Sequence, residues 1–183
     1  MKRLIYTVSL LLSLQGVAQD ASHYDSLLAN TDEVSLSDSL HINTIYDERN
    51  RLDSADVKQW FFPLLGSVNN NRLKNRAYFL NGKITGNPNF NLLLIMEEKK
   101  KNDTINSQVV YIITTRKDGT YIASLKAAIA GIKKKSSYNT SSWLYSDYKV
   151  VLDSKMVINE RPYYDLANYK INRTGRFILY PNY

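Results

Sequence analysis

From Arg76 to Tyr180 the apolar residues of the chain recur at every second position, in short runs separated by turn-forming residues. Successive side chains of a β-strand point to opposite faces, so this period predicts strands with one apolar face. The first runs are Tyr78–Ile84 and Phe90–Glu97. The second contains the uninterrupted apolar segment LLLIM, which predicts a strand covered on both faces.

The segment QVVYIITTRKDGTYIASL, residues 108–125, predicts a β-hairpin. An Asp-Gly pair between two apolar runs favours a tight two-residue turn, with positive φ at both Asp118 and Gly119. Because the residues paired outward from this turn share one face, the stretch is interpreted as framework and not as a site. Three opposed pairs are predicted: Arg116 with Tyr121, Thr114 with Ala123, and Ile112 with Leu125.

The segment from Leu125 to Lys135 fits two structures. Its apolar residues have helical spacing, but Gly131 interrupts a helix, and the preceding strand could simply continue. We expect the strand to end near Lys126 and an irregular basic loop to follow it.

A further alternating stretch runs from Trp143 to Leu152. It predicts one strand with Trp143 and Tyr145 on one face and Leu144 and Val150 on the other.

A second tight hairpin is predicted at Thr174-Gly175, between Tyr169–Arg173 and Arg176–Tyr180. About six or seven strands with short connections predict an α+β fold that is mainly β. We expect an antiparallel meander, curved into an open sheet or half-barrel and packed with a short N-terminal helix.

That helix is predicted directly before the strands. The apolar residues of SADVKQWFFPLLG, residues 54–66, follow the spacing of one helix face. Ser54 is a suitable N-cap and Pro63 cannot continue a helix, so the prediction runs from about Ala55 to Phe62. Helix and strands together define a domain over residues 54–183.

The first eighteen residues have the pattern of a secretory signal peptide. Lys2 and Arg3 precede an apolar stretch, and cleavage is expected near Ala18 or Gln19. The stretch is too short for a spanning helix, which needs about 20 apolar residues. Residues 19–53 follow as an acidic, partly ordered arm. The protein is therefore expected to be periplasmic or secreted, and without cysteine it can form neither a disulfide nor a thiolate metal site.

The net charge of +7 is distributed unevenly. Between Asp20 and Lys58 nine residues are acidic and three are basic, whereas from Gln59 onward eight are acidic and nineteen are basic. Such asymmetry indicates an interaction surface or a tail that folds back on its own domain. The alternative is a lysine-rich solvated surface.

Two lysine triplets stand out in the basic part: Lys99, Lys100 and Lys101, and Lys133, Lys134 and Lys135. Both are predicted in loops. If these loops lie at the same end of the sheet, they form a positive rim that would attract a polyanion in a salt-dependent way. The alternative is that exposed loops carry lysine for solubility and to discourage edge pairing.

Tyrosine is abundant, with fourteen residues. Trp143, Tyr145, Tyr163 and Tyr164 could line a face that binds a glycan or a peptide. Tyrosine is also an ordinary residue of strands that have one face in water.

Few residues favour catalysis or metal binding. His23 and His41 both lie in the acidic arm, where solvated polar side chains are the default interpretation. Ser146 and Lys149 match Ser-x-x-Lys, but strand-like surroundings would place them on opposite faces instead of one helix turn apart. We expect no enzyme activity, no cofactor and no metal, although an active site assembled from distant residues would leave no such motif.

Three features resemble secreted β-rich domains of unknown function from Bacteroidota. They are the leader ending in Val17-Ala18-Gln19, the unit of strand, Lys117-Asp118-Gly119 and strand, and the closing hairpin from Tyr169 to Tyr180. The resemblance covers about the last 110 residues of the chain and implies an exported antiparallel β domain. It supplies no catalytic or binding residues that can be carried over.

These observations predict an exported, non-enzymatic binding or interaction module. Its partner could be an envelope polyanion, a glycan or another exported protein, and nucleic acid is not expected. One alternative is an inhibitor or structural partner that pairs through an exposed edge strand. Another is a carrier of a small apolar ligand, or an enzyme, whose pocket lies between sheet and helix and is lined by Trp60, Phe61, Leu92, Leu94 and Ile112.

Overall fold

The computed structural model describes residues 23–44, 50–58, 75–101, 104–133 and 135–180. The leader predicted at residues 1–18 lies outside this part. The fold is mainly β, as predicted, with nine described strands instead of six or seven and short helices at 23–29 and 54–58. The strands are β1 (Ser39–Ile42), β2 (Arg76–Ile84), β3 (Asn91–Lys101), β4 (Thr104–Thr115), β5 (Tyr121–Lys133), β6 (Ser136–Tyr145), β7 (Lys149–Ile158), β8 (Arg161–Ile171) and β9 (Phe177–Tyr180).

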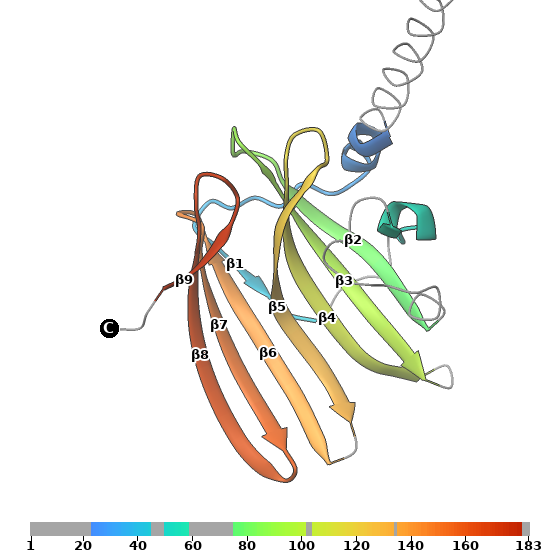
Figure 1. Cartoon of the computed structure of the whole chain (residues 1–183), viewed down its shortest axis with the longest axis vertical. Coiled ribbons are helices and arrows are strands. Elements are labelled where there is room, and N and C mark those ends of the chain that lie inside the picture. Colours follow the sequence, from blue (N-terminus) through green and yellow to red (C-terminus); the bar gives the residue numbers. More distant parts are fainter. Residues whose placement is uncertain (1–22, 45–49, 59–74, 102–103, 134, 181–183) are drawn as a thin grey trace, which may run out of the picture.

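All these strands belong to one curved antiparallel sheet (Figure 1). Strands β2 to β9 pair in sequence order, so the predicted meander is confirmed. The one departure is β1, which pairs with β6. β5 pairs with β6 only over Ile129–Lys133, and β1 pairs with the later part of β6, residues 142–145, from which β5 has diverged. The acidic segment thus contributes a strand to the sheet.

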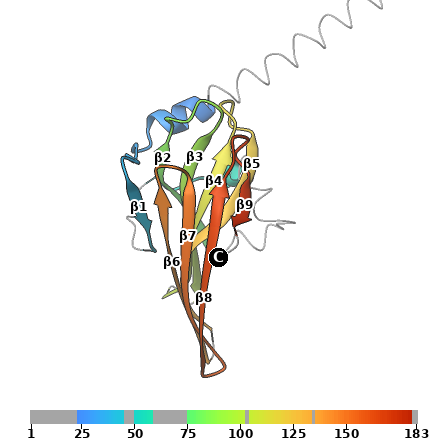
Figure 2. The same cartoon turned by 90° about the vertical axis from the view of Figure 1, so that its left-hand side faces the viewer.

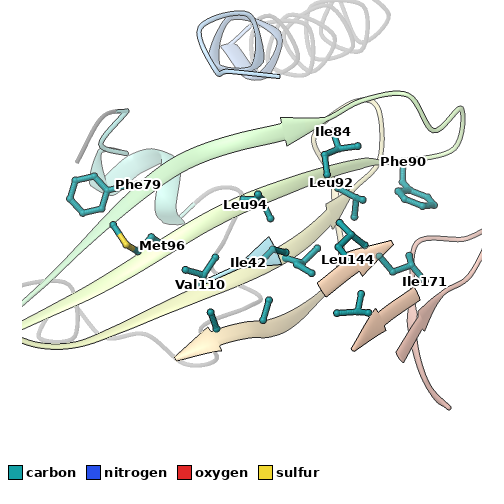
Figure 3. Close-up of a cluster of buried hydrophobic side chains, with 14 residues drawn as sticks. Ile42, Phe79, Ile84, Phe90, Leu92, Leu94, Met96, Val110, Leu144 and Ile171 are labelled. Carbon is teal, nitrogen blue, oxygen red and sulfur yellow. The ribbon is translucent and has the colours of Figure 1, made fainter. Parts of the chain in front are cut away.

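The curved sheet encloses a large apolar cluster, here called the inner core (Figure 3). Leu92 and Leu94 of β3 and Ile112 of β4 share it with Leu144 of β6 and Ile171 of β8. These five side chains are at most 3% exposed. Full burial of one such side chain contributes about 1.5–3 kcal/mol, so this core holds the two halves of the sheet together.

The opposite face of β2, β3 and β4 carries a second apolar cluster, the outer core. Leu93 and Ile95 of β3 pack there with Tyr24 from helix 23–29 and Val57 from helix 54–58. The two helices therefore lie against this face (Figure 1). The prediction that the LLLIM segment is covered on both faces is confirmed.

Tyr24 brings a polar group into the outer core. Its side chain is fully buried, and its hydroxyl lies 2.6 Å from Thr115 Oγ1 in a hydrogen bond. Asn91 Nδ2 donates a second hydrogen bond to the hydroxyl oxygen at 3.3 Å. Burial raises the pKa of Tyr24 above its usual value of 10.0.

This raised pKa predicts a loss of stability at alkaline pH. Above pH 10.0 the unfolded chain loses the Tyr24 proton while the folded protein keeps it, so the free energy of unfolding falls as pH rises through this window. Tyr24→Phe removes that contribution and costs about 1 kcal/mol at neutral pH through the lost hydrogen bonds. Urea unfolding at about pH 8 and about pH 11 should show a smaller alkaline loss for Tyr24→Phe than for the wild type. The exposed Tyr164→Phe is the control and should behave like the wild type; equal alkaline losses in all three proteins would contradict the prediction.

The β4–β5 hairpin has a three-residue turn. The N–H of Gly119 donates to Arg116 O at 3.1 Å, and the N–H of Arg116 donates to Thr120 O at 2.8 Å. Gly119 has a φ of 87°, and Asp118 is not among the residues with positive φ. This is a type I turn followed by a left-handed glycine, so the predicted two-residue turn with two positive φ angles is wrong.

The extra turn residue changes the register only near the turn. Thr115, and not Arg116, pairs with Tyr121, and a bulge follows. The predicted pairs farther from the turn, Thr114 with Ala123 and Ile112 with Leu125, are confirmed.

The β6–β7 and β8–β9 hairpins have their turns at the same end of the strands as the β4–β5 turn (Figure 1). The predicted β8–β9 hairpin is confirmed and has the same turn, with Gly175 at a φ of 81°. The β6–β7 hairpin was not predicted, because its left-handed residue is Tyr148 and not glycine. The Tyr148 ring packs edge-on against Phe90, with centroids 5.6 Å apart, which offsets an unfavourable backbone conformation. The expected single strand from Trp143 to Leu152 is therefore two strands.

Strand β5 continues to Lys133, so the strand end predicted near Lys126 is wrong. A bulge in the pairing with β4 lies between Lys126 and Ala128, and both Ala127 and Ala128 are buried in the inner core. Because an extra residue interrupts the period of two, the spacing of apolar residues resembles that of a helix. Gly131 pairs with Tyr138 within regular sheet.

Helix 54–58 begins where expected but has a different cap. Asp53 Oδ1 accepts the N–H of Ala55 at 2.7 Å and that of Asp56 at 2.8 Å, so Asp53 and not Ser54 is the N-cap. The predicted helix end at Phe62 lies outside the described residues. No helix in the described part of the chain is long and apolar enough to cross a membrane.

Candidate functional site

The β4–β5 and β8–β9 hairpins have their turns at the same end of the strands (Figure 1). Residues of both hairpins line a groove there. This hairpin groove has a volume of about 840 Å³. Its wall combines cationic side chains with one carboxylate, one aromatic ring and an aliphatic side chain. The lining residues are Asn89, Arg116, Lys117, Asp118, Tyr121, Ile122, Arg173, Thr174 and Arg176.

The two hairpins are fixed against each other beside the groove. Thr114 Oγ1 donates a buried hydrogen bond to Gly175 O at 2.6 Å. A Cβ on Gly175 would lie 3.1 Å from Ile122 Cδ1, so the missing side chain lets the β8–β9 turn approach β5 closely. The groove walls are therefore held by the fold and not only by loop conformation.

Positive charge reaches the hairpin groove from both sides. Arg116 belongs to one hairpin, and Arg173 and Arg176 belong to the other. All three arginines are exposed, and none forms an ion pair with another described residue. Their guanidinium groups keep their donors for solvent or for a ligand.

Lys117 is the fourth cation and is held in place. Its Nζ donates to Asn91 Oδ1 at 2.7 Å and to Thr85 O at 3.2 Å. Partial burial lowers the pKa of Lys117 below its usual value of 10.5. Lys117 therefore joins the β4–β5 turn to Thr85, directly after β2, and to Asn91, the first residue of β3.

Asp118 is the carboxylate in the groove wall. Its Oδ1 accepts the backbone N–H of Thr120 at 2.9 Å. This backbone hydrogen bond, helped by the side chain of Thr120 and the charge of Arg116, holds the pKa of Asp118 below 3.8. The carboxylate is exposed and ionised at neutral pH, so it can accept further hydrogen bonds.

The lysine triplets lie at the opposite end of the strands from the hairpin groove (Figure 1). They share one end of the sheet, but Lys99, Lys100, Lys101 and Lys133 belong to β3 and β5. The prediction of loops is wrong for these four, because strand pairing continues through them to short connections. Lys135 Nζ is 2.8 Å from Glu160 Oε1 in an exposed ion pair, and Lys134 lies outside the described residues.

Trp143 and Tyr145 lie on the face of β6 that points away from the inner core, and the strand faces predicted for them are confirmed. Trp143 is 43% exposed, and its ring centroid is 4.6 Å from that of His41 in the neighbouring β1. Tyr164 of β8 shares this face. Tyr163 points to the opposite face, because it is an even number of residues from Tyr169, which packs against the inner core. Figure 2 shows β6, β7 and β8 running beyond the other strands, where residues 161–166 of β8 are exposed. None of these aromatic residues lines the hairpin groove.

The residues considered for catalysis and metal binding do not come together. His23 Nε2 lies 2.8 Å from Asp56 Oδ1 and links the two helices, whereas His41 lies against Trp143. Ser146 lies in the β6–β7 turn and Lys149 begins β7, without the helix that Ser-x-x-Lys chemistry requires. Among the described residues, no group of three His, Asp or Glu side chains could hold a metal ion.

The residues proposed for a pocket between sheet and helix are placed differently. Leu92, Leu94 and Ile112 are packed in the inner core, on the sheet face away from the two helices. They do not line a space between sheet and helix. Trp60 and Phe61 lie outside the described residues.

Comparison of the chain with models of protein families, with curated proteins and with solved structures yields no match. Candidate residues for function are therefore identified from geometry and charge.

The hairpin groove is not predicted from the sequence, although arginines near two turn glycines indicate where it lies. In both hairpins an arginine lies within three residues of the turn glycine, in Arg116-Lys117-Asp118-Gly119 and in Arg173-Thr174-Gly175-Arg176. The local pattern of each unit predicts only a turn, because the approach of the two turns depends on the curvature of the sheet.

Proposed function

We propose that the protein is an exported, non-enzymatic module that binds an anionic ligand in the hairpin groove. The observation that carries the proposal is the set of unpaired guanidinium groups of Arg116, Arg173 and Arg176 around one concave surface. A guanidinium group donates two parallel hydrogen bonds to a carboxylate or phosphate, which gives both affinity and orientation. The expected secretory leader supports an extracytoplasmic ligand.

Solubility alone explains these arginines less well than ligand binding does. Exposed cations elsewhere are of two kinds: Lys135, Lys155 and Lys170 have acidic partners at 2.7 to 3.8 Å, whereas Lys99, Lys126 and Arg161 form no ion pair with another described residue and do not line the groove. What distinguishes the groove is that it gathers three arginines around one concave surface, where the single carboxylate of Asp118 offsets only part of their mutual repulsion.

The rigid frame of the groove also favours binding. The Thr114–Gly175 hydrogen bond and the close packing of Gly175 on Ile122 fix the two hairpins before a ligand arrives. A preformed site loses less conformational entropy on binding than a flexible one, so more of the interaction energy appears as affinity.

The proposal predicts that Arg173→Gln combined with Arg176→Gln weakens binding of oligogalacturonate and polyphosphate by about tenfold or more. The affinity should also depend less steeply on salt than in the wild type, because fewer ionic contacts are screened. Fluorescence anisotropy with labelled probes at several salt concentrations measures both effects.

The matched control is Lys99→Gln combined with Lys100→Gln, which removes the same charge at the far end of β3. Both residues are exposed, and neither lines the hairpin groove. The control should keep its affinity. Loss of binding in the lysine variant alone would place the anion at the lysine triplets and would overturn the groove as the site.

A further inference from the structure

The hairpin groove contains a hydrogen-bond acceptor among its donors. Asp118 lines it together with Arg116, Arg173 and Arg176. A dense polyanion without hydroxyl groups gains nothing from this carboxylate and is repelled by it. A ligand that carries both an anionic group and hydroxyl groups uses the two kinds of residue at once.

The turn holds Asp118 in a state that suits this role. The hydrogen bond of 2.9 Å from the Thr120 N–H fixes the side chain, and Asp118 remains ionised at neutral pH because its pKa is lowered. An ionised carboxylate has about four acceptor positions, so the turn hydrogen bonds do not exhaust it. A hydroxyl that donates to such a carboxylate forms a charge-assisted hydrogen bond.

The groove wall also has an apolar part. Tyr121 and Ile122 are partly exposed, and the Tyr121 hydroxyl shares a hydrogen bond of 3.0 Å with Ser124 Oγ, which fixes the ring. Tyr121 packs on the outer core and Ile122 on the inner core, so the two side chains reach the groove from opposite faces of β5. The exposed part of each side chain offers a contact for the C–H groups of a sugar. A phosphate chain has no comparable apolar surface.

We propose that the ligand of the hairpin groove is an acidic polysaccharide of the uronate class. Its carboxylate binds Arg116, Arg173 and Arg176, and one of its hydroxyl groups donates to Asp118. Tyr121 and Ile122 contact the sugar ring. This inference rests on the proposed function and narrows it from anions in general to anionic sugars.

The test compares oligogalacturonate with polyphosphate of equal total charge, at one ionic strength, by fluorescence anisotropy competition against wild-type protein. Electrostatics alone favours polyphosphate, because its charge density is higher. The uronate proposal predicts the opposite order. Tighter binding of polyphosphate by the wild type would overturn it.

Asp118→Asn provides the second measurement. Asparagine keeps an amide oxygen for the Thr120 N–H and is well accepted before glycine in hairpin turns, so the fold is retained. Removing the negative charge of residue 118 lowers the repulsion of both anionic probes and so strengthens polyphosphate binding. Oligogalacturonate in addition exchanges a charge-assisted hydrogen bond for a weaker neutral one. The preference for oligogalacturonate over polyphosphate should therefore fall by about threefold or more.

An unchanged or increased preference in Asp118→Asn would overturn the uronate proposal. If Arg173→Gln with Arg176→Gln weakens both probes while Asp118→Asn leaves the preference unchanged, anion binding stands and only the sugar class fails. If the arginine variant weakens neither probe, both proposals fail.

Discussion

Leu93→Ala and Leu94→Ala should each lower the free energy of unfolding by about 2–5 kcal/mol, although the two side chains point to opposite faces of β3. Leu93 is 0% exposed in the outer core and Leu94 is 2% exposed in the inner core. Each truncation removes transfer free energy and leaves a cavity that rigid neighbours cannot fill. Chemical denaturation of the two variants measures both losses.

Ile178→Ala is the matched control for this pair. Ile178 lies in the short strand β9 and is 49% exposed, so its truncation should cost less than about 1 kcal/mol. A small loss for Leu93→Ala would contradict the account of the outer core, because that face would then be open to water instead of covered by the helices.

Gly119→Ala should destabilise the protein by about 2–4 kcal/mol, through two independent effects. Gly119 has a φ of 87°, a conformation that costs an L-residue energy. A Cβ at this position would lie 2.7 Å from Tyr24 Cγ, at the root of a fully buried ring. Because the ring cannot move without disturbing the outer core, the helix 23–29 would have to shift.

Gly86→Ala is the natural comparison for that substitution. Gly86 has no positive φ, and a Cβ added there would meet no atom within 4 Å. Its replacement should be neutral or slightly stabilising, because alanine restricts the unfolded chain. Thermal or urea unfolding of both variants separates the effects, and equal stability of the two would contradict the close contact between Gly119 and Tyr24.

Much of the fold follows from local patterns in the sequence. The period of two across β2, β3 and β4 predicted the strands, and LLLIM predicted cover on both faces. Gly119 and Gly175 marked two hairpins because glycine alone adopts their backbone conformation easily.

Other elements escaped for physical reasons that are visible in the structure. Strand β1 pairs with β6, although β2 to β5 lie between them in the sequence. No local pattern indicates so distant a partner. The β6–β7 turn places Tyr148 at a φ of 65°, where ring packing against Phe90 takes the place of a glycine signal. The bulge at Ala127 broke the alternation in β5.

The candidate site could not be predicted because it is formed by tertiary structure. Arg116 and Arg173 come from separate hairpins, and only the curvature of the sheet brings their turns to one groove. The lysine triplets, in contrast, are evident in the sequence because their charges are adjacent. Adjacency in sequence is a weak guide to a site when distant turns meet in space.

An oligogalacturonate titration of the isotope-labelled protein, followed by backbone amide chemical shifts, tests the groove most directly. The account predicts saturable shifts concentrated in residues 116–122 and 173–176, with little change in β3 near Lys99 or around Trp143. Shifts concentrated at the lysine triplets or on the Trp143 face, or the absence of saturable shifts, would contradict the assignment of anion binding to the hairpin groove.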